Sequence, residues 1–166
     1  LVTGPLADED NFMTSRYGPN GLETVTVLAG LRNYLKGIAE VDYAKGCDIV
    51  DAGWPATEIL PAPMSEQEKQ GIAEAVAKAG ESDVIIAVLG EDEYRTGESR
   101  SRTSLDLPGR QQQLLEALHA TGKPVILGLI NGQPLTVNWA NAYIPAILES
   151  WFPGCQGGTV IAETLF

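Results

Sequence analysis

One segment of this 166-residue chain gathers most of the side chains that could act as acids, bases or anion ligands. The segment runs from residue 91 to residue 108 and carries Glu91, Asp92, Glu93 and Glu98 beside Arg95, Arg100 and Arg102. Carboxyl groups can serve as general acids and bases, and a guanidinium can hold a carboxylate or a hydroxyl-rich ligand. The segment is longer than the ~12–15 residues beyond which a structureless loop usually has a function. Its length therefore indicates a functional loop, although composition alone favours a solvated surface loop of mixed charge.

The sequence lacks the motifs for metal binding, dithiol redox chemistry and phosphate binding. The only histidine is His119, and the cysteines Cys47 and Cys155 form no Cys-x-x-Cys motif. No glycine-rich phosphate-binding motif follows an apolar run. We therefore expect no metal and no cofactor, a histidine near the end of a helix, and two small buried thiols.

The overall charge excludes two classes of partner. The formal net charge is −11 and the sequence pI is about 4.4. Such a chain repels a phosphate backbone or an anionic membrane surface, so we expect no nucleic-acid partner and no membrane partner. No apolar run approaches the ~20 residues that span a bilayer.

Short apolar strands alternate with amphipathic helices along the whole chain. The patterns predict strands near 1–5, 41–44, 83–90, 124–130 and 146–151 and helices over 21–35, 65–79, 108–122 and 161–166, with an irregular loop over 48–63. The continuous apolar runs are typical of strands buried on both faces. The sequence therefore predicts one α/β domain over residues 1–166, a mostly parallel sheet between helices in a flavodoxin-like three-layer sandwich. Because the chain opens in a strand and closes in a helix, we expect a domain excised from a longer protein.

Three loops should meet at one edge of this sheet. They are residues 90–93, 131–134 and 152–158, each following a predicted strand and each rich in glycine or polar residues. Ligands of parallel sheets bind outside the carboxyl ends of the strands, so this edge is the expected binding site.

The motifs along the chain resemble the C-terminal α/β domain of glycoside hydrolase family 3 β-glucosidases. The resemblance rests on Gly90-Glu91 with the run from Gly97-Glu98-Ser99-Arg100 to Leu107-Pro108, and on Gly4-Pro5-Leu6-Ala7-Asp8, Tyr17-Gly18-Pro19, Gly122-Lys123-Pro124, Asn131-Gly132-Gln133-Pro134 and Trp151-Phe152-Pro153-Gly154 in the same order. Each string alone is weakly specific, but together they cover nearly the whole chain.

The resemblance implies a retaining, exo-acting enzyme that hydrolyses terminal β-D-glucosyl residues of a carbohydrate. In such enzymes an N-terminal (β/α)₈ barrel supplies the aspartate nucleophile, and the α/β domain supplies the loop with the general acid/base. A ~250-residue barrel cannot fit in this chain, so we expect the chain alone to be inactive. The alternative is a non-catalytic sandwich domain that stabilises the barrel. Enzymes that look like this one are often periplasmic or secreted.

Two carboxylates are candidates for the acid/base. Glu91 matches the Gly-Glu at which many relatives place it and is the first candidate, whereas Glu98 could reach the same point from a mobile loop. Arg100 and Arg102 are expected to order the loop or to line the mouth of the sugar pocket. Trp151 could stack on a sugar ring, but a tryptophan that ends a buried strand is more often part of the core.

Overall fold

The computed structural model describes residues 1–11, 13–19, 21–50 and 63–166. The chain forms five strands and five helices in these parts: β1 Val2–Thr3, α1 Val27–Tyr34, β2 Tyr43–Ala44, α2 Glu66–Gly80, β3 Ile85–Gly90, α3 Gln111–His119, β4 Val125–Ile130, α4 Asn138–Tyr143, β5 Ala146–Glu149 and α5 Gly157–Leu165. None of the described helices is long and apolar enough to cross a membrane.

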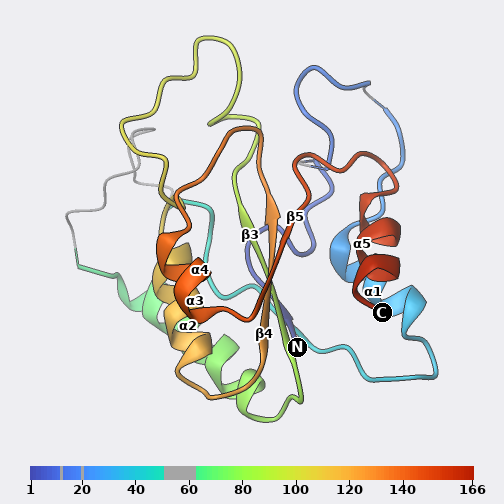
Figure 1. The fold of residues 1–166 in the computed structure, drawn as a ribbon, viewed down its shortest axis with the longest axis vertical. Helices are drawn as coiled ribbons and strands as arrows, with labels where there is room; N and C mark the ends of the chain where they lie inside the picture. The colour runs from blue at the N-terminus through green and yellow to red at the C-terminus, as the bar shows by residue number, and fades with distance from the viewer. Residues whose placement is uncertain (12, 20, 51–62) are drawn as a thin grey trace.

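The strands form a single parallel sheet between two layers of helices. Its strand order is β2-β1-β3-β4-β5, so the short strand β1 lies between β2 and β3. Helices α1 and α5 cover one face, and α2, α3 and α4 lie against the other (Figure 1). This arrangement confirms the predicted three-layer α/β fold, and the strand order is that of flavodoxin-like proteins.

Strand β3 divides its side chains between the two cores because alternate residues of a strand point to opposite faces. Ile85 and Leu89 pack into the cluster that includes α2 and α3, whereas Ile86 and Val88 pack into the cluster with α1 and α5. All six residues of the strand are buried. The continuous apolar run in the sequence therefore reflects burial on both faces, as predicted.

The helix starts follow local capping chemistry. Ser65 and Glu68 form the predicted capping box at the start of α2, with both reciprocal hydrogen bonds present. Helix α1 begins later than its apolar spacing predicts, because the Thr26 side chain accepts a hydrogen bond from the Ala29 N–H and caps the helix there.

Two elements differ from the sequence prediction. Helix α4 falls in a stretch for which the sequence predicts no element, and it lacks a side-chain cap that would have marked its start. Strand β5 is mostly exposed although its apolar residues predict a buried strand, because it lies at the edge of the sheet. Most of the loop expected over 48–63 lies outside the described residues.

Helices α1 and α5 approach each other through two glycines. A Cβ on Gly30 would collide with the Gly158 carbonyl group, and a Cβ on Gly158 would collide with the Thr26 carbonyl oxygen. Both obstacles are backbone atoms, which cannot rotate away. The close packing of these two helices therefore depends on the absence of side chains at both positions.

We expect Gly30→Ala to lower the free energy of unfolding by roughly 1–3 kcal/mol, since the added methyl group forces the two helix backbones apart. Gly80→Ala is the matched control, because Gly80 also lies in a helix and a Cβ there meets nothing within 4 Å. That control should be neutral or slightly stabilising. Urea unfolding of both variants measures the difference, and equal stabilities would contradict the packing argument.

Candidate functional site

The candidate site lies at the carboxyl edge of the sheet, beside the loop that follows β3. The strand order reverses between β1 and β3, and ligands of such sheets bind in the crevice at this point. The loop that follows β1 and the loop over 91–108 both rise from this edge (Figure 1). The sheet thus brings together segments that are far apart in the sequence.

A buried glutamine fixes the point where β3 becomes the loop. Gln111 accepts a hydrogen bond from the Gly90 N–H and donates one to the Gly90 carbonyl, both at 2.8 Å. Gly90 has a φ of 139°, and a Cβ there would collide with the Ile130 carbonyl group. The sequence carries no signal that marks Gln111, because a polar residue in the first turn of a helix matches no motif. Its two hydrogen bonds fix the direction in which the loop leaves the sheet.

Glu91 lies in the interior at the start of the loop and is 0% exposed. It forms an ion pair with Arg102, whose side chain is 3% exposed. Gln133 Nε2 donates a hydrogen bond to Glu91 Oε1 at 3.0 Å, and Glu91 Oε2 is buried without a hydrogen-bond partner among the described residues. The pair joins the start of the loop to its second half and ties both to the loop after β4.

A second buried ion pair organises the first turn of the loop. Asp92 pairs with Arg95, and its Oδ1 accepts hydrogen bonds from the Tyr94 and Arg95 N–H groups at 3.1 Å each. Aspartate commonly stabilises a tight turn in this way. Asp92 therefore has a structural partner.

The second half of the loop is attached to the segment after β4. Arg102 Nη2 donates a hydrogen bond to the Asp106 carbonyl at 2.6 Å, and the Thr136 N–H donates one to the Leu105 carbonyl at 2.7 Å. Asp106 and Thr136 form an isolated parallel bridge. Both ends of the loop are thus fixed, and the tip projects between them.

Glu98 occupies this projecting tip and is exposed. Its carboxylate has no hydrogen-bond or ion-pair partner within the described parts of the chain, whereas its backbone N–H donates to Tyr17 Oη at 2.7 Å. Arg100 is also exposed, and Glu93 is partly buried. The structure thus places the two acid/base candidates in opposite environments, Glu91 buried and paired, Glu98 open to solvent.

An open hollow of about 340 Å³ lies beside the loop tip. Tyr17, Gly97, Gly132 and Trp151 line it, together with the fully buried Asn131. The Asn131 Oδ1 atom has no hydrogen-bond partner among the described residues. Trp151 is 49% exposed, so it does not occupy the core position that is more usual for a tryptophan at the end of a buried strand.

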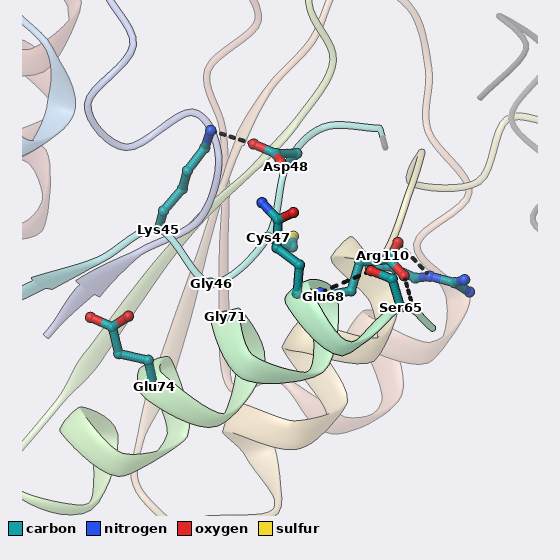
Figure 2. A pocket seen from close by; sticks show the side chains of 10 residues that line it. Lys45, Gly46, Cys47, Asp48, Ser65, Glu68, Gly71, Glu74 and Arg110 are labelled. Carbon is teal, nitrogen blue, oxygen red and sulfur yellow. Dashed lines mark hydrogen bonds and ion pairs between the residues drawn. The ribbon is translucent and has the colours of Figure 1, made fainter. Parts of the chain in front are cut away.

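A second hollow of about 330 Å³ lies at the carboxyl end of β2, but its charged groups already have partners (Figure 2). Lys45 pairs with Asp48, and Arg110 Nε lies 3.0 Å from Glu68 Oε1. Partial burial acts to raise the pKa of Glu68, but hydrogen bonds from the Ser65 N–H and from Arg110 outweigh it and hold the pKa below its usual value. This hollow therefore offers paired structural ions rather than a free acid or base.

The thiols and the histidine are located as follows. Cys47 is buried, and burial raises the pKa of its thiol to about 12, so it stays protonated at neutral pH. Cys155 is only partly buried, which differs from the predicted burial of both thiols. His119 lies in the last turn of α3 as predicted, with its ring 5.5 Å from that of Trp139. No cluster of metal-ligating side chains occurs in the described parts of the chain.

Comparison with known proteins identifies the family. The glycosyl hydrolase family 3 C-terminal domain matches residues 1–166. The chain belongs to this family. It is 40% identical to a periplasmic beta-glucosidase of Salmonella typhimurium and 38% identical to a beta-xylosidase of Formosa agariphila, in each case over 99% of the chain and 22% of the relative. The solved structure of the β-glucosidase EmGH1 from Erythrobacter marinus superposes with a TM-score of 0.82 at 38% identity, covering 99% of this chain and 24% of that one.

These matches confirm the family and the fold that the sequence motifs indicated. This family 3 domain spans about a fifth of the length of the curated relatives that it matches. The roles of individual site residues are not part of these matches and rest on the geometry of the loop.

The buried pair gives a test of how the loop of this family 3 domain is organised. We expect Arg102→Met to lower the free energy of unfolding by about 3–5 kcal/mol, because it leaves the Glu91 carboxylate buried without its partner. The double variant Glu91→Gln with Arg102→Met removes both charges and should lose less. Urea unfolding provides the measurement.

Lys69→Met is the matched control, because it removes the cation of the exposed Lys69–Glu66 pair. Exposed pairs contribute at most about 1 kcal/mol. A loss in Arg102→Met no larger than in this control would show that the buried pair does not hold the loop.

Proposed function

We propose that this chain works as a domain of a retaining, exo-acting β-glucosidase that hydrolyses terminal β-D-glucosyl residues. In this proposal the loop over 91–108 supplies the general acid/base and one wall of the sugar pocket, and a barrel domain of the same protein supplies the nucleophile. The observation that carries the proposal is the exposed carboxylate of Glu98 at the tip of a loop whose two ends are fixed in the fold.

The proposed chemistry needs two carboxyl groups on the two sides of the scissile bond. Retaining glycosidases place them ~5–5.5 Å apart: one attacks the anomeric carbon, and the other protonates the leaving oxygen. The second group then removes a proton from the water that hydrolyses the glycosyl-enzyme. A carboxyl group on a loop tip can enter a pocket formed with another domain, which suits it to the acid/base role.

Glu98 fits this role better than Glu91, although the family resemblance first favours Glu91. An acid/base has to come within hydrogen-bond reach of the leaving oxygen, about 2.6–3.2 Å. Glu91 is 0% exposed, and its carboxylate is already held by Arg102 and Gln133. We therefore assign Glu98 as the acid/base and Glu91 as the internal anchor of its loop.

The remaining candidates take supporting roles in this proposal. Arg102 orders the loop through its pair with Glu91, whereas the exposed Arg100 and Trp151 are free to face a sugar. Relatives named beta-glucosidase and beta-xylosidase support a β-glycoside as substrate, and the periplasmic beta-glucosidase of Salmonella typhimurium supports a periplasmic or secreted location. The alternative function is a non-catalytic domain that stabilises a barrel.

The isolated chain is expected to hydrolyse p-nitrophenyl β-D-glucoside negligibly, because the nucleophile of the proposed mechanism lies in another domain. The full-length protein should be active in the same assay, and p-nitrophenyl β-D-xyloside tests the sugar preference. Turnover by the isolated chain would mean that both carboxylates lie within these 166 residues and would overturn the shared-site mechanism.

In the full-length protein, Glu98→Ala should lower kcat/KM about 100-fold or more for aryl glucosides with poor leaving groups, which need a proton. Substrates with good leaving groups, such as 2,4-dinitrophenyl glucoside, should form the glycosyl-enzyme at nearly the normal rate. Added azide should then restore turnover and yield a glucosyl azide, since azide needs no general base.

Glu93→Ala is the matched control, because Glu93 lies on the same loop and has no role in the mechanism. If Glu91→Ala shows the azide-dependent pattern and Glu98→Ala does not, the two assignments must be exchanged. If neither variant shows it, the domain is structural and the alternative function holds.

A further inference from the structure

The loop that follows β1 touches the acid/base loop at Glu98 itself. Tyr17 Oη accepts a hydrogen bond from the Glu98 backbone N–H at 2.7 Å, across 81 residues of sequence. Tyr17 belongs to the Tyr17-Gly18-Pro19 motif, for which the fold and the proposed chemistry have not otherwise required a role. The hydrogen bond therefore links this motif directly to the acid/base loop.

Tyr17 does not serve to fill the hydrophobic core. Its side chain is 66% exposed, so the ring contributes little to the core. The backbone around it is nevertheless fixed, because the Ser15 carbonyl accepts a hydrogen bond from the Gly18 N–H at 2.8 Å and Ser15 Oγ accepts one from the Tyr17 N–H at 3.2 Å. The hydroxyl is thus presented from a defined turn.

The backbone on the donor side of this hydrogen bond, around Glu98, is also defined by local contacts. Glu98 stands between two residues with positive φ, Gly97 at 113° and Ser99 at 62°, and the Arg100 N–H closes the turn onto the Gly97 carbonyl at 3.1 Å. A Cβ on Gly97 would lie 3.2 Å from Tyr17 Oη and 3.0 Å from Arg16 Cδ, so the two loops are in close contact. The tip backbone therefore forms a closed turn that meets the tyrosine at the Glu98 peptide.

We propose that Tyr17 is a positioning residue that holds the peptide of Glu98 and thereby sets the place from which its carboxyl group reaches the leaving oxygen. The proposal rests on the assignment of Glu98 as acid/base. Misplacement of a catalytic group by ~1 Å can lower a rate about 100-fold. The loss of one hydrogen bond at a loop tip should displace the carboxyl group by less than this, so the rate should fall by less than 100-fold.

Tyr17→Phe in the full-length protein removes the hydroxyl oxygen and keeps the ring. We expect kcat for aryl glucosides with poor leaving groups to fall roughly three- to tenfold, in line with the loss of one hydrogen bond. KM for these substrates should stay unchanged. The kcat/KM for 2,4-dinitrophenyl glucoside, which reports formation of the glycosyl-enzyme and needs no proton, should also stay unchanged, so that kcat/KM depends more steeply on the leaving group. Tyr34→Phe is the control, because Tyr34 lies in α1 beside Phe166 and belongs to neither loop.

Other outcomes overturn the proposal. A raised KM with unchanged kcat would mean that the Tyr17 hydroxyl contacts the substrate. An equal fall in kcat/KM for substrates with good and poor leaving groups, together with a lower Tm than the control, would mean a purely structural role for Tyr17. Kinetics equal to those of the wild type for every substrate would mean that the hydrogen bond has no role in positioning.

A double variant separates this proposal from the assignment on which it rests. If Tyr17 acts through Glu98, adding Tyr17→Phe to Glu98→Ala should cause no further loss for poor leaving groups. Should Glu98→Ala itself lack the azide-dependent pattern, the acid/base assignment fails. If Glu98→Ala shows the azide-dependent pattern and Tyr17→Phe has wild-type kinetics, the positioning role of Tyr17 fails and the acid/base assignment of Glu98 stands.

Discussion

The buried ion pair between Glu91 and Arg102 is the interaction on which the loop over 91–108 depends. It connects the end of the central strand β3 to the second half of the loop, and Gln133 connects both to the loop after β4. Two charges in the interior are stable only while they remain paired, so this contact couples the path of the loop to the integrity of the sheet edge. The tip can then project from a fixed base.

The sheet topology explains why this loop and the loop after β1 meet. Strand β1 lies next to β3 although α1, β2 and α2 intervene in the chain, and parallel strands direct their following loops to the same edge. Tyr17 and Glu98 consequently come within hydrogen-bond distance. The Gly30–Gly158 contact of α1 with α5 fixes the layer beneath the loop after β1. The candidate site thus depends on packing at some distance from its carboxylates.

Much of the fold could be predicted from the sequence because local chemistry specified it. The apolar run of β3 and the Ser65–Glu68 capping box each determine an element without help from distant residues. Helix α4 and the exposure of β5 could not be predicted in this way. The first has no capping signal, and the second follows from the position of β5 at the end of the strand order, which no local pattern records.

The candidate site shows the same division. The motifs and apolar patterns of the chain predict the family, the three-layer fold, and the loop that carries both Glu91 and Glu98 between two predicted elements. They did not determine which carboxylate is buried, and the motif match favoured Glu91 as the reactive group. The environments of the two carboxylates follow from the folded arrangement, because the partners of Glu91 lie at positions 102 and 133 and the contact of Glu98 lies at position 17. A carboxylate's surroundings are set by residues distant in sequence, and these are brought together by the packing of the sheet edge.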